Sequence, residues 1–178
     1  HMVRDVMADT RFQDFLLAYM EREATPTLKE LPGVDLDAYR RQLIARFGNA
    51  AVKDTVPRLC AESSDRIPKW LLPVVRENLA AGRDVTLSAA IVASWARYAE
   101  GTDEQGNPIK IVDRLSERVQ ENASGNRTDI LSFIRDRGIF GDLVDAEPFT
   151  KAYSETLSSL HDRGAEATID ALLTQVTV

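Results

Sequence analysis

Cationic side chains and small hydroxyl groups gather between residues 46 and 70, a stretch that reads RFGNAAVKDTVPRLCAESSDRIPKW. Lys53, Arg58, Arg66 and Lys69 give it a local basic excess within an acidic chain. A guanidinium group presents five N–H donors in a rigid fork, which suits hydrogen bonding to hydroxyl and carboxylate oxygens. The stretch is therefore a candidate binding site for a polyhydroxylated or carboxylated small molecule.

A plainer interpretation of the same stretch is an exposed helical face with ordinary ion pairs. Asp54 and Arg58 stand four residues apart, the spacing at which side chains pair on a helix. Surface pairs of this kind are common and individually weak. Composition alone favours this structural interpretation, and Arg76, which lies outside the stretch, is also expected to be structural.

Several kinds of chemistry have no support in the sequence. The chain contains no G-x-G-x-x-G turn for a dinucleotide pyrophosphate, no P-loop and no G-x-S-x-G nucleophile turn. No metal site is expected, because His161 stands apart from other ligands, and we expect it to act in packing or at a helix end. Cys60, the one cysteine, is expected to be a small buried apolar side chain and not a nucleophile.

Length and charge restrict the function further. The chain has 178 residues, 44% of them hydrophobic, which suffices for one domain but is short for a dehydrogenase with separate cofactor and substrate domains. The net charge of -6 disfavours binding to nucleic acid or to an anionic membrane. No apolar run is long enough to cross a bilayer, and no signal-peptide pattern opens the chain. A single cysteine fits a reducing compartment, so a cytoplasmic location is expected.

The first two residues, His1 and Met2, are typical of a cloning remnant. We therefore expect one domain over residues 3–178, cut from a longer protein. Apolar residues recur at helical spacing, and no β-rich block or repeat appears, so the predicted fold class is all-α with roughly eight helices. The predicted helices cover residues 3–24, 36–47, 50–62, 68–81, 87–100, 113–121, 128–137, 146–161 and a last segment ending near 176.

Caps and breakers refine these predictions. Asp9 is a candidate N-cap inside the first run, and Asp35 caps the second helix, which ends at Gly48. Pro57 favours a start near residue 56 as an alternative for the third helix, and residues 63–67 are expected to form a loop.

The segment over residues 87–100 is apolar nearly all round, which predicts the central buried helix. Thr86 is its expected N-cap. Trp70 is expected in the core, and Tyr39 on the buried face of its own helix. A weak strand pattern covers residues 109–112.

The chain also resembles a known family. RFGNAAVKDT and RLCAESSDRIPKW are similar to the patterns RF-x-N-x-x-x-x-D-T and R-I-x-x-D-x-S-x-K-I-P-K in the C-terminal domain of long-chain mannitol dehydrogenases. The similarity continues through LLPVVRENLAAG, ASWARYAEGTDEQGNP, FGDLVDAEPFTKAY and LHDRGA, so it covers essentially the whole chain. This family of NAD-dependent polyol dehydrogenases includes mannitol 2-dehydrogenase and the hexuronate oxidoreductases.

The resemblance implies a substrate site made of Arg58, Arg66, Ser64 and Lys69. Arg58 occupies the family's substrate-binding arginine position, and Arg66 stands where the family usually has lysine. Both are expected to hydrogen-bond the far hydroxyls of a polyol. Ser64 and Lys69 match other positions of the pattern. Ala61 stands where some members have histidine, which puts the fine substrate preference in doubt.

The family's catalytic motif is K-x-x-x-x-N-x-x-H, whose lysine is the general base, and it lies shortly before the equivalent of Val3. This chain contains no match to it. The resemblance therefore implies the substrate-binding domain of an NAD-dependent mannitol 2-dehydrogenase, which interconverts D-mannitol and D-fructose. Its own N-terminal domain would bind most of the NAD, and the 178 residues alone are expected to be inactive.

Two other hypotheses stay open. In a fructuronate or tagaturonate reductase, Arg58 and Arg66 would clamp a carboxylate. In a non-enzymatic helical interaction domain, the basic stretch would dock an acidic partner. If a further domain does pack here, an apolar face near the N-terminal or central helix is expected to be exposed, and two copies of the chain could pair through it.

Overall fold

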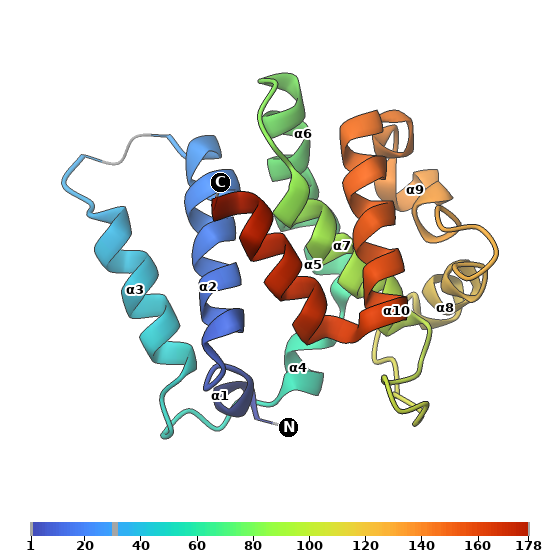
Figure 1. Ribbon diagram of the computed structural model, residues 1–178, viewed down its shortest axis with the longest axis horizontal. Helices are drawn as coiled ribbons and strands as arrows, with labels where there is room; N and C mark the ends of the chain where they lie inside the picture. The colour runs from blue at the N-terminus through green and yellow to red at the C-terminus, as the bar shows by residue number, and fades with distance from the viewer. Residues whose placement is uncertain (1, 30–31, 178) are drawn as a thin grey trace.

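The computed structural model describes residues 2–29 and 32–177, and it confirms the predicted all-α class (Figure 1). Within these ranges the extended residues form isolated bridges only, so the strand expected over residues 109–112 does not form. The α-helices are α1 (Val3–Val6), α2 (Thr10–Tyr19), α3 (Leu36–Phe47), α4 (Val56–Cys60), α5 (Ser63–Trp70), α6 (Leu72–Ala80), α7 (Thr86–Ala99), α8 (Ser116–Ser124), α9 (Arg137–Phe140) and α10 (Glu147–Thr177). Shorter turns are the π-helical η1 (Met20–Ala24) and the 3-10 helices η2 (Thr25–Thr27), η3 (Phe133–Arg135) and η4 (Leu143–Asp145).

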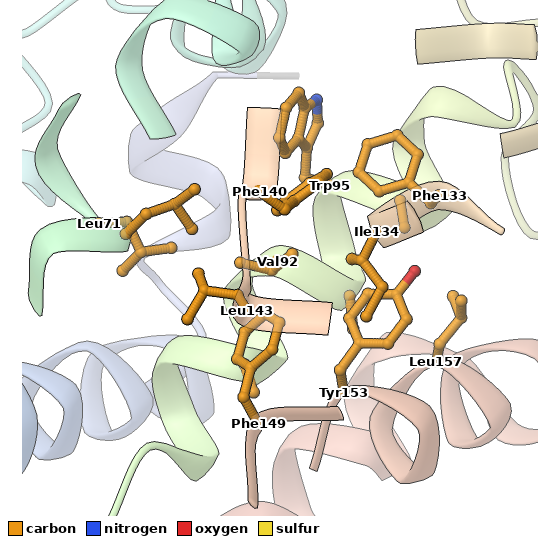
Figure 2. Packing of buried hydrophobic residues seen from close by; sticks show 14 of the residues in the cluster. Leu71, Val92, Trp95, Phe133, Ile134, Phe140, Leu143, Phe149, Tyr153 and Leu157 are labelled. Atoms are coloured by element: carbon orange, nitrogen blue, oxygen red, sulfur yellow. The ribbon is translucent and has the colours of Figure 1, made fainter. Parts of the chain in front are cut away.

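Helix α7 is the central buried helix, as its composition predicts. Nine of its fourteen residues are buried, and α10 packs along it. At its C-terminal half, Trp95 meets two aromatic rings edge-on or tilted, with centroid distances of 4.9 Å to Phe133 and 5.8 Å to Phe140 (Figure 2). These rings give the core a fixed geometry, because aromatic pairs favour such arrangements over face-to-face stacking.

Helix α10 is bent into two arms at Gly164, whose φ of 80° and ψ of 177° are not helical. The two arms form a V in Figure 1, with the bend in the lower half of the view. The second arm begins at Ala165, whose backbone N–H donates to Glu104 Oε1 over 2.7 Å. A carboxylate from a distant loop therefore caps this arm, and glycine supplies the backbone conformation that the bend requires.

The N-terminus of α7 is also capped from a distance, so the expected Thr86 cap is wrong. The backbone N–H groups of Leu87 and Ser88 donate to the Glu23 carboxylate over 2.6 and 2.7 Å. Glu23 is 1% exposed, and this burial raises its pKa, while the hydrogen bonds from Ser88 and Leu87 offset part of the rise. The carboxylate belongs to η1, and Glu23 lies 64 residues before Leu87 in the sequence.

Two local caps are confirmed. Asp9 accepts from the N–H of Arg11 at the start of α2, and Asp35 accepts from that of Ala38 at the start of α3, which ends at Gly48. The expected burial of Tyr39 is wrong, since it is 57% exposed. Helix α3 lies at one edge of the molecule beside α2, so only a narrow face of α3 is buried (Figure 1).

Residues 50–70 differ from the main prediction in three ways. Helix α4 begins at Val56, which is the alternative start predicted from Pro57, and Thr55 caps it. Residues 63–67 are not a loop but the first part of α5, which also contains Pro68. The break between the two helices falls at Glu62, whose φ of 57° is in the left-handed region.

The helix predicted over residues 128–137 is also wrong. Asp129 accepts from the N–H of Leu131 over 3.1 Å, which closes a turn in place of a helical start. The chain continues as η3 and α9, and α9 includes Gly138.

Candidate functional site

Arg58 projects from α4 as a largely exposed side chain, 65% accessible. Its Nε donates to Asp54 Oδ1 over 2.5 Å and its Nη2 donates to Asp54 Oδ2, so the pair is bonded at two points. This contact lowers the pKa of Asp54 and raises that of Arg58. The ion pair that the plainer interpretation of the sequence predicts between these two residues is therefore present.

Arg66 reaches the same surface from α5. Its Nη1 donates to the carbonyl oxygen of Leu59, the residue after Arg58, over 3.1 Å. Its positive charge also helps to lower the pKa of Asp54. Arg66 is therefore bonded to the residue next to Arg58, and the charges of both arginines act on the Asp54 carboxylate.

The two fixed guanidinium groups keep hydrogen-bonding capacity. Arg58 uses its Nε and Nη2 on Asp54, and Arg66 uses Nη1 on Leu59. Each guanidinium has five N–H donors, so several are left for oxygens of a bound molecule. Because their protein partners restrict both side chains, less conformational freedom is lost when a ligand binds.

Ser64 and Lys69 are placed differently from the arginines. Ser64 is buried at 5% exposure, where its N–H donates to Asp113 Oδ2 over 2.9 Å and its hydroxyl donates to Asp113 Oδ1. Lys69 is exposed and pairs with Asp65 over 2.9 Å, which lowers the pKa of that carboxyl. The structure thus brings Arg58 and Arg66 together, with Ser64 in a supporting layer.

Trp70 is 75% exposed, so the expectation that it lies in the core is wrong. Ser64, Ile67 and Leu71 take the inward positions of this segment, which turns Trp70 outward, one helical turn after Arg66. Leu59 and Val112 are further exposed apolar side chains, and the α4–α5 surface is accordingly part apolar and part cationic.

The N-terminal residues run beside this face. Met2 pairs with Thr55 in an antiparallel bridge, and the N–H of Val3 donates to the carbonyl oxygen of Asp54 over 3.0 Å. Arg4 Nη1 donates to the carbonyl oxygen of Ala50 over 2.6 Å. The start of α1 is therefore attached directly to the segment that leads into Arg58.

The side chains of His161 and Cys60 have surroundings that indicate a structural role. His161 Nε2 lies 2.7 Å from Glu100 Oε1 in the interior, and burial raises the pKa of the Cys60 thiol. Across residues 2–29 and 32–177, no cluster of three or more His, Cys, Asp or Glu side chains is arranged to hold a metal ion. In the same ranges, no helix combines the length and apolarity needed to span a membrane.

A cavity of about 590 Å³ lies between the two arms of α10, away from the arginines. Its lining is mixed, with the hydroxyls of Thr156, Ser159 and Thr168 beside apolar Leu172. The face that carries Arg58 and Arg66 is instead an open surface, which suits one wall of a site completed by another part of a protein.

Comparison with known proteins identifies the family of the chain. The family profile "Mannitol dehydrogenase C-terminal domain" matches residues 1–161. The mannitol 2-dehydrogenase of Phaeosphaeria nodorum is 34% identical over 168 residues, which are 94% of this chain and 29% of that protein. The Escherichia coli K12 protein "Uncharacterized oxidoreductase YdfI" is 38% identical over 172 residues, 94% of this chain and 35% of that protein.

Comparison with solved structures indicates the same family. Pseudomonas fluorescens mannitol 2-dehydrogenase, in a ternary complex with NAD and D-mannitol, matches with a TM-score of 0.92 and 32% identity over 98% of this chain and 36% of that one. A substrate-free D-sorbitol dehydrogenase shares the fold with a TM-score of 0.84 at 23% identity, over 94% of this chain and 34% of that one. The chain thus spans about a third of the relatives it matches, and it belongs to the mannitol dehydrogenase family as its C-terminal domain.

Proposed function

We propose that this chain supplies the substrate-binding wall of an NAD-dependent mannitol 2-dehydrogenase, which interconverts D-mannitol and D-fructose. The observation that carries the proposal is the shared face of Arg58 and Arg66, held by Asp54 and by the Leu59 carbonyl oxygen. Two cations with spare donors would hold the hydroxyls of a hexitol that lie far from the reacting carbon. Ser64, which is bonded to Asp113, and Lys69, which is paired with Asp65, are the other residues that we propose for this site.

The chemistry itself would take place next to this face. The start of α1 lies against Asp54 and Thr55, so a catalytic segment shortly before Val3 would be close to Arg58. We propose that NAD is held mainly by an N-terminal dinucleotide-binding domain, which would accept the hydride while a lysine base takes the hydroxyl proton. The 178 residues alone would bind weakly and turn nothing over. The single cysteine fits a cytoplasmic enzyme.

The experiment that tests this is a domain exchange. These residues would replace the corresponding 36% of the Pseudomonas fluorescens enzyme, and NADH formation with D-mannitol would be measured. We expect activity in the chimera, and a rise in KM of at least about tenfold in its Arg58→Ala variant, the cost of about 1.4 kcal/mol of binding. An Arg135→Ala variant, which loses an exposed pair with Asp129, is the matched control. A folded chimera that is inactive on hexitols and ketohexoses would contradict the proposal.

A second candidate, reduction of a hexuronate such as fructuronate or tagaturonate, is favoured by one feature. Arg66 stands at a family lysine position, and a guanidinium can bind a carboxylate at two points where an ammonium cannot. Comparing kcat/KM for fructose and fructuronate in the same chimera distinguishes the two substrates.

We also propose an occupant for the exposed apolar side chains around the arginines. Leu59, Trp70 and Val112 would face the dinucleotide-binding domain or its bound substrate, because large exposed apolar side chains beside a binding site are typical of a surface that another domain covers. When that domain is missing, two copies of the chain would pair through this surface. Sedimentation at rising concentration tests it, and a Trp70→Glu variant that associates as strongly as the parent would rule it out.

A further inference from the structure

The turn between α4 and α5 is held by a segment that is distant in the sequence. Glu62 occupies this turn in a left-handed conformation, with φ of 57° and ψ of 35°. Its N–H donates to the carbonyl oxygen of Val112 over 2.9 Å, and its carboxylate accepts from the N–H of Arg114 over 3.1 Å. A residue with a Cβ rarely adopts this backbone conformation, and it persists where the surrounding structure imposes it.

Asp113, between those two residues, holds the start of α5. Its two carboxylate oxygens accept from the N–H and the hydroxyl of Ser64. Oδ1 also accepts from the N–H of Leu115 over 2.8 Å, which fixes the orientation of the carboxylate. Glu62 and Ser64, at the junction of the two helices, are therefore both attached to residues 112–114.

This attachment reaches the arginine directly. The backbone N–H of Arg66 donates to the carbonyl oxygen of Glu62 over 3.1 Å, and its Nη1 bonds to Leu59 on α4. The angle at Glu62 thus sets where Arg66 stands relative to Arg58. We propose that Asp113 and Glu62 are positioning residues, which set the separation of the two substrate-binding guanidinium groups and hence the length of substrate they accept.

The proposal rests on the proposed function for its effect on substrate, but its structural part is testable without activity. In the 178-residue chain, Asp113→Asn should speed amide hydrogen exchange at Ser64 and Arg66 by tenfold or more. Asp129→Asn is the matched control, since Asp129 also accepts from the N–H two residues later but pairs with Arg135 and not with Ser64. Unchanged exchange at Arg66 in Asp113→Asn would overturn the inference.

The second measurement uses the chimera with a dinucleotide-binding domain. We expect Asp113→Asn to raise KM for the hexitol about tenfold while kcat changes less than about twofold, with a smaller rise for Ser64→Ala. Glu62→Gly removes the conformational restraint but suits a left-handed position, so it should raise KM while the melting temperature is kept or increased. A variant that is more stable and yet binds less well cannot be explained by a purely structural role.

The outcomes separate cleanly. If the unmodified chimera is inactive, the proposed function fails, and the exchange data alone decide whether Asp113 and Glu62 hold Arg66 in place. If the chimera is active and KM stays unchanged in Asp113→Asn and Glu62→Gly, the positioning role is excluded. Lower melting temperatures with unchanged KM would assign these residues to stability only.

Discussion

Asp54 lies just before α4 and is joined at two points to Arg58, four residues later, while the charge of Arg66 also acts on the Asp54 carboxylate. The pKa of Asp54 is lowered from its ordinary 3.8, first by the hydrogen bonds from Arg58. The stabilisation that this pair contributes is thus present above pH 3.8 and is lost as the pH falls through the lowered pKa. Arginine geometry at this face should accordingly be constant throughout the neutral range.

Removing either arginine should raise the pKa of Asp54. We expect Arg58→Ala to raise it more, because the hydrogen bonds from Arg58 are the largest cause of the lowering, and Arg66→Ala to raise it by a smaller amount, because Arg66 acts only through its charge. Carboxyl chemical shifts followed by NMR from pH 2 to pH 6 provide the measurement, in steps of about half a unit. Equal titration curves in the parent and both variants would show that neither arginine acts on the Asp54 carboxyl group.

The two tryptophans should report on different regions. Trp70 is 75% exposed, whereas Trp95 is 4% exposed within the ring cluster. We expect Trp70→Phe to remove the component of fluorescence emission at longer wavelength and most of the quenching by acrylamide. Trp95→Phe should leave both, and it serves as the control. An emission spectrum that Trp70→Phe does not shift to shorter wavelength would contradict the outward position of this side chain.

Glu23 should give the protein an unusual pH dependence. Burial raises its pKa from 4.5, so its contribution to stability is fully present below pH 4.5 and declines as the pH rises through the raised value. Glu23→Gln abolishes this titration and leaves one N–H of Leu87 or Ser88 without an acceptor, at a cost of about 1–3 kcal/mol.

Urea unfolding at several pH values measures both effects. The stability advantage of the parent over Glu23→Gln should shrink as the pH rises from 4.5. Glu21→Gln, an exposed carboxylate in the same π-helical turn, should be close to neutral at every pH. An advantage that grows with pH would show that Glu23 is ionised more easily in the folded chain than in water.

The aromatic cluster should dominate the stability of the core. Phe133 is 1% exposed and contacts both Trp95 and Phe140 (Figure 2). Phe133→Ala should lower the free energy of unfolding by about 3–5 kcal/mol, because it leaves a cavity. Tyr39→Ala, at a site that is 57% exposed, should change it by no more than about 0.5 kcal/mol. Chemical denaturation of both variants provides the comparison, and similar losses would show that the rings do not anchor the fold.

The sequence predicts those features whose signals are local. Asp35 and Gly48 delimit α3 through residues that lie next to its ends, and the apolar run of α7 identifies the buried centre. The pairing of Asp54 with Arg58 is equally local. Each of these signals depends on neighbours within about one or two turns, which is the range over which spacing and capping rules act.

The features that sequence reasoning missed depend on distant partners. Asp113 lies 49 residues from Ser64, and Glu23 lies 64 residues from Leu87, so no local pattern indicates either contact. The position of Trp70 also departs from the predicted helix over residues 68–81. Trp70 is the last residue of α5 and α6 begins at Leu72, with Ile67 and Leu71 packed against the core, so Trp70 points outward.

In three helices, a backbone N–H of the first turn donates to a carboxylate that is distant in the sequence: Asp113 for α5, Glu23 for α7 and Glu104 for the second arm of α10. The cap of each of these helices comes from another segment of the chain. Little free energy is therefore gained when one of them forms early in folding. Folding should therefore be all-or-none, and a nick in the turn between α6 and α7 would leave two peptides that need each other to become ordered.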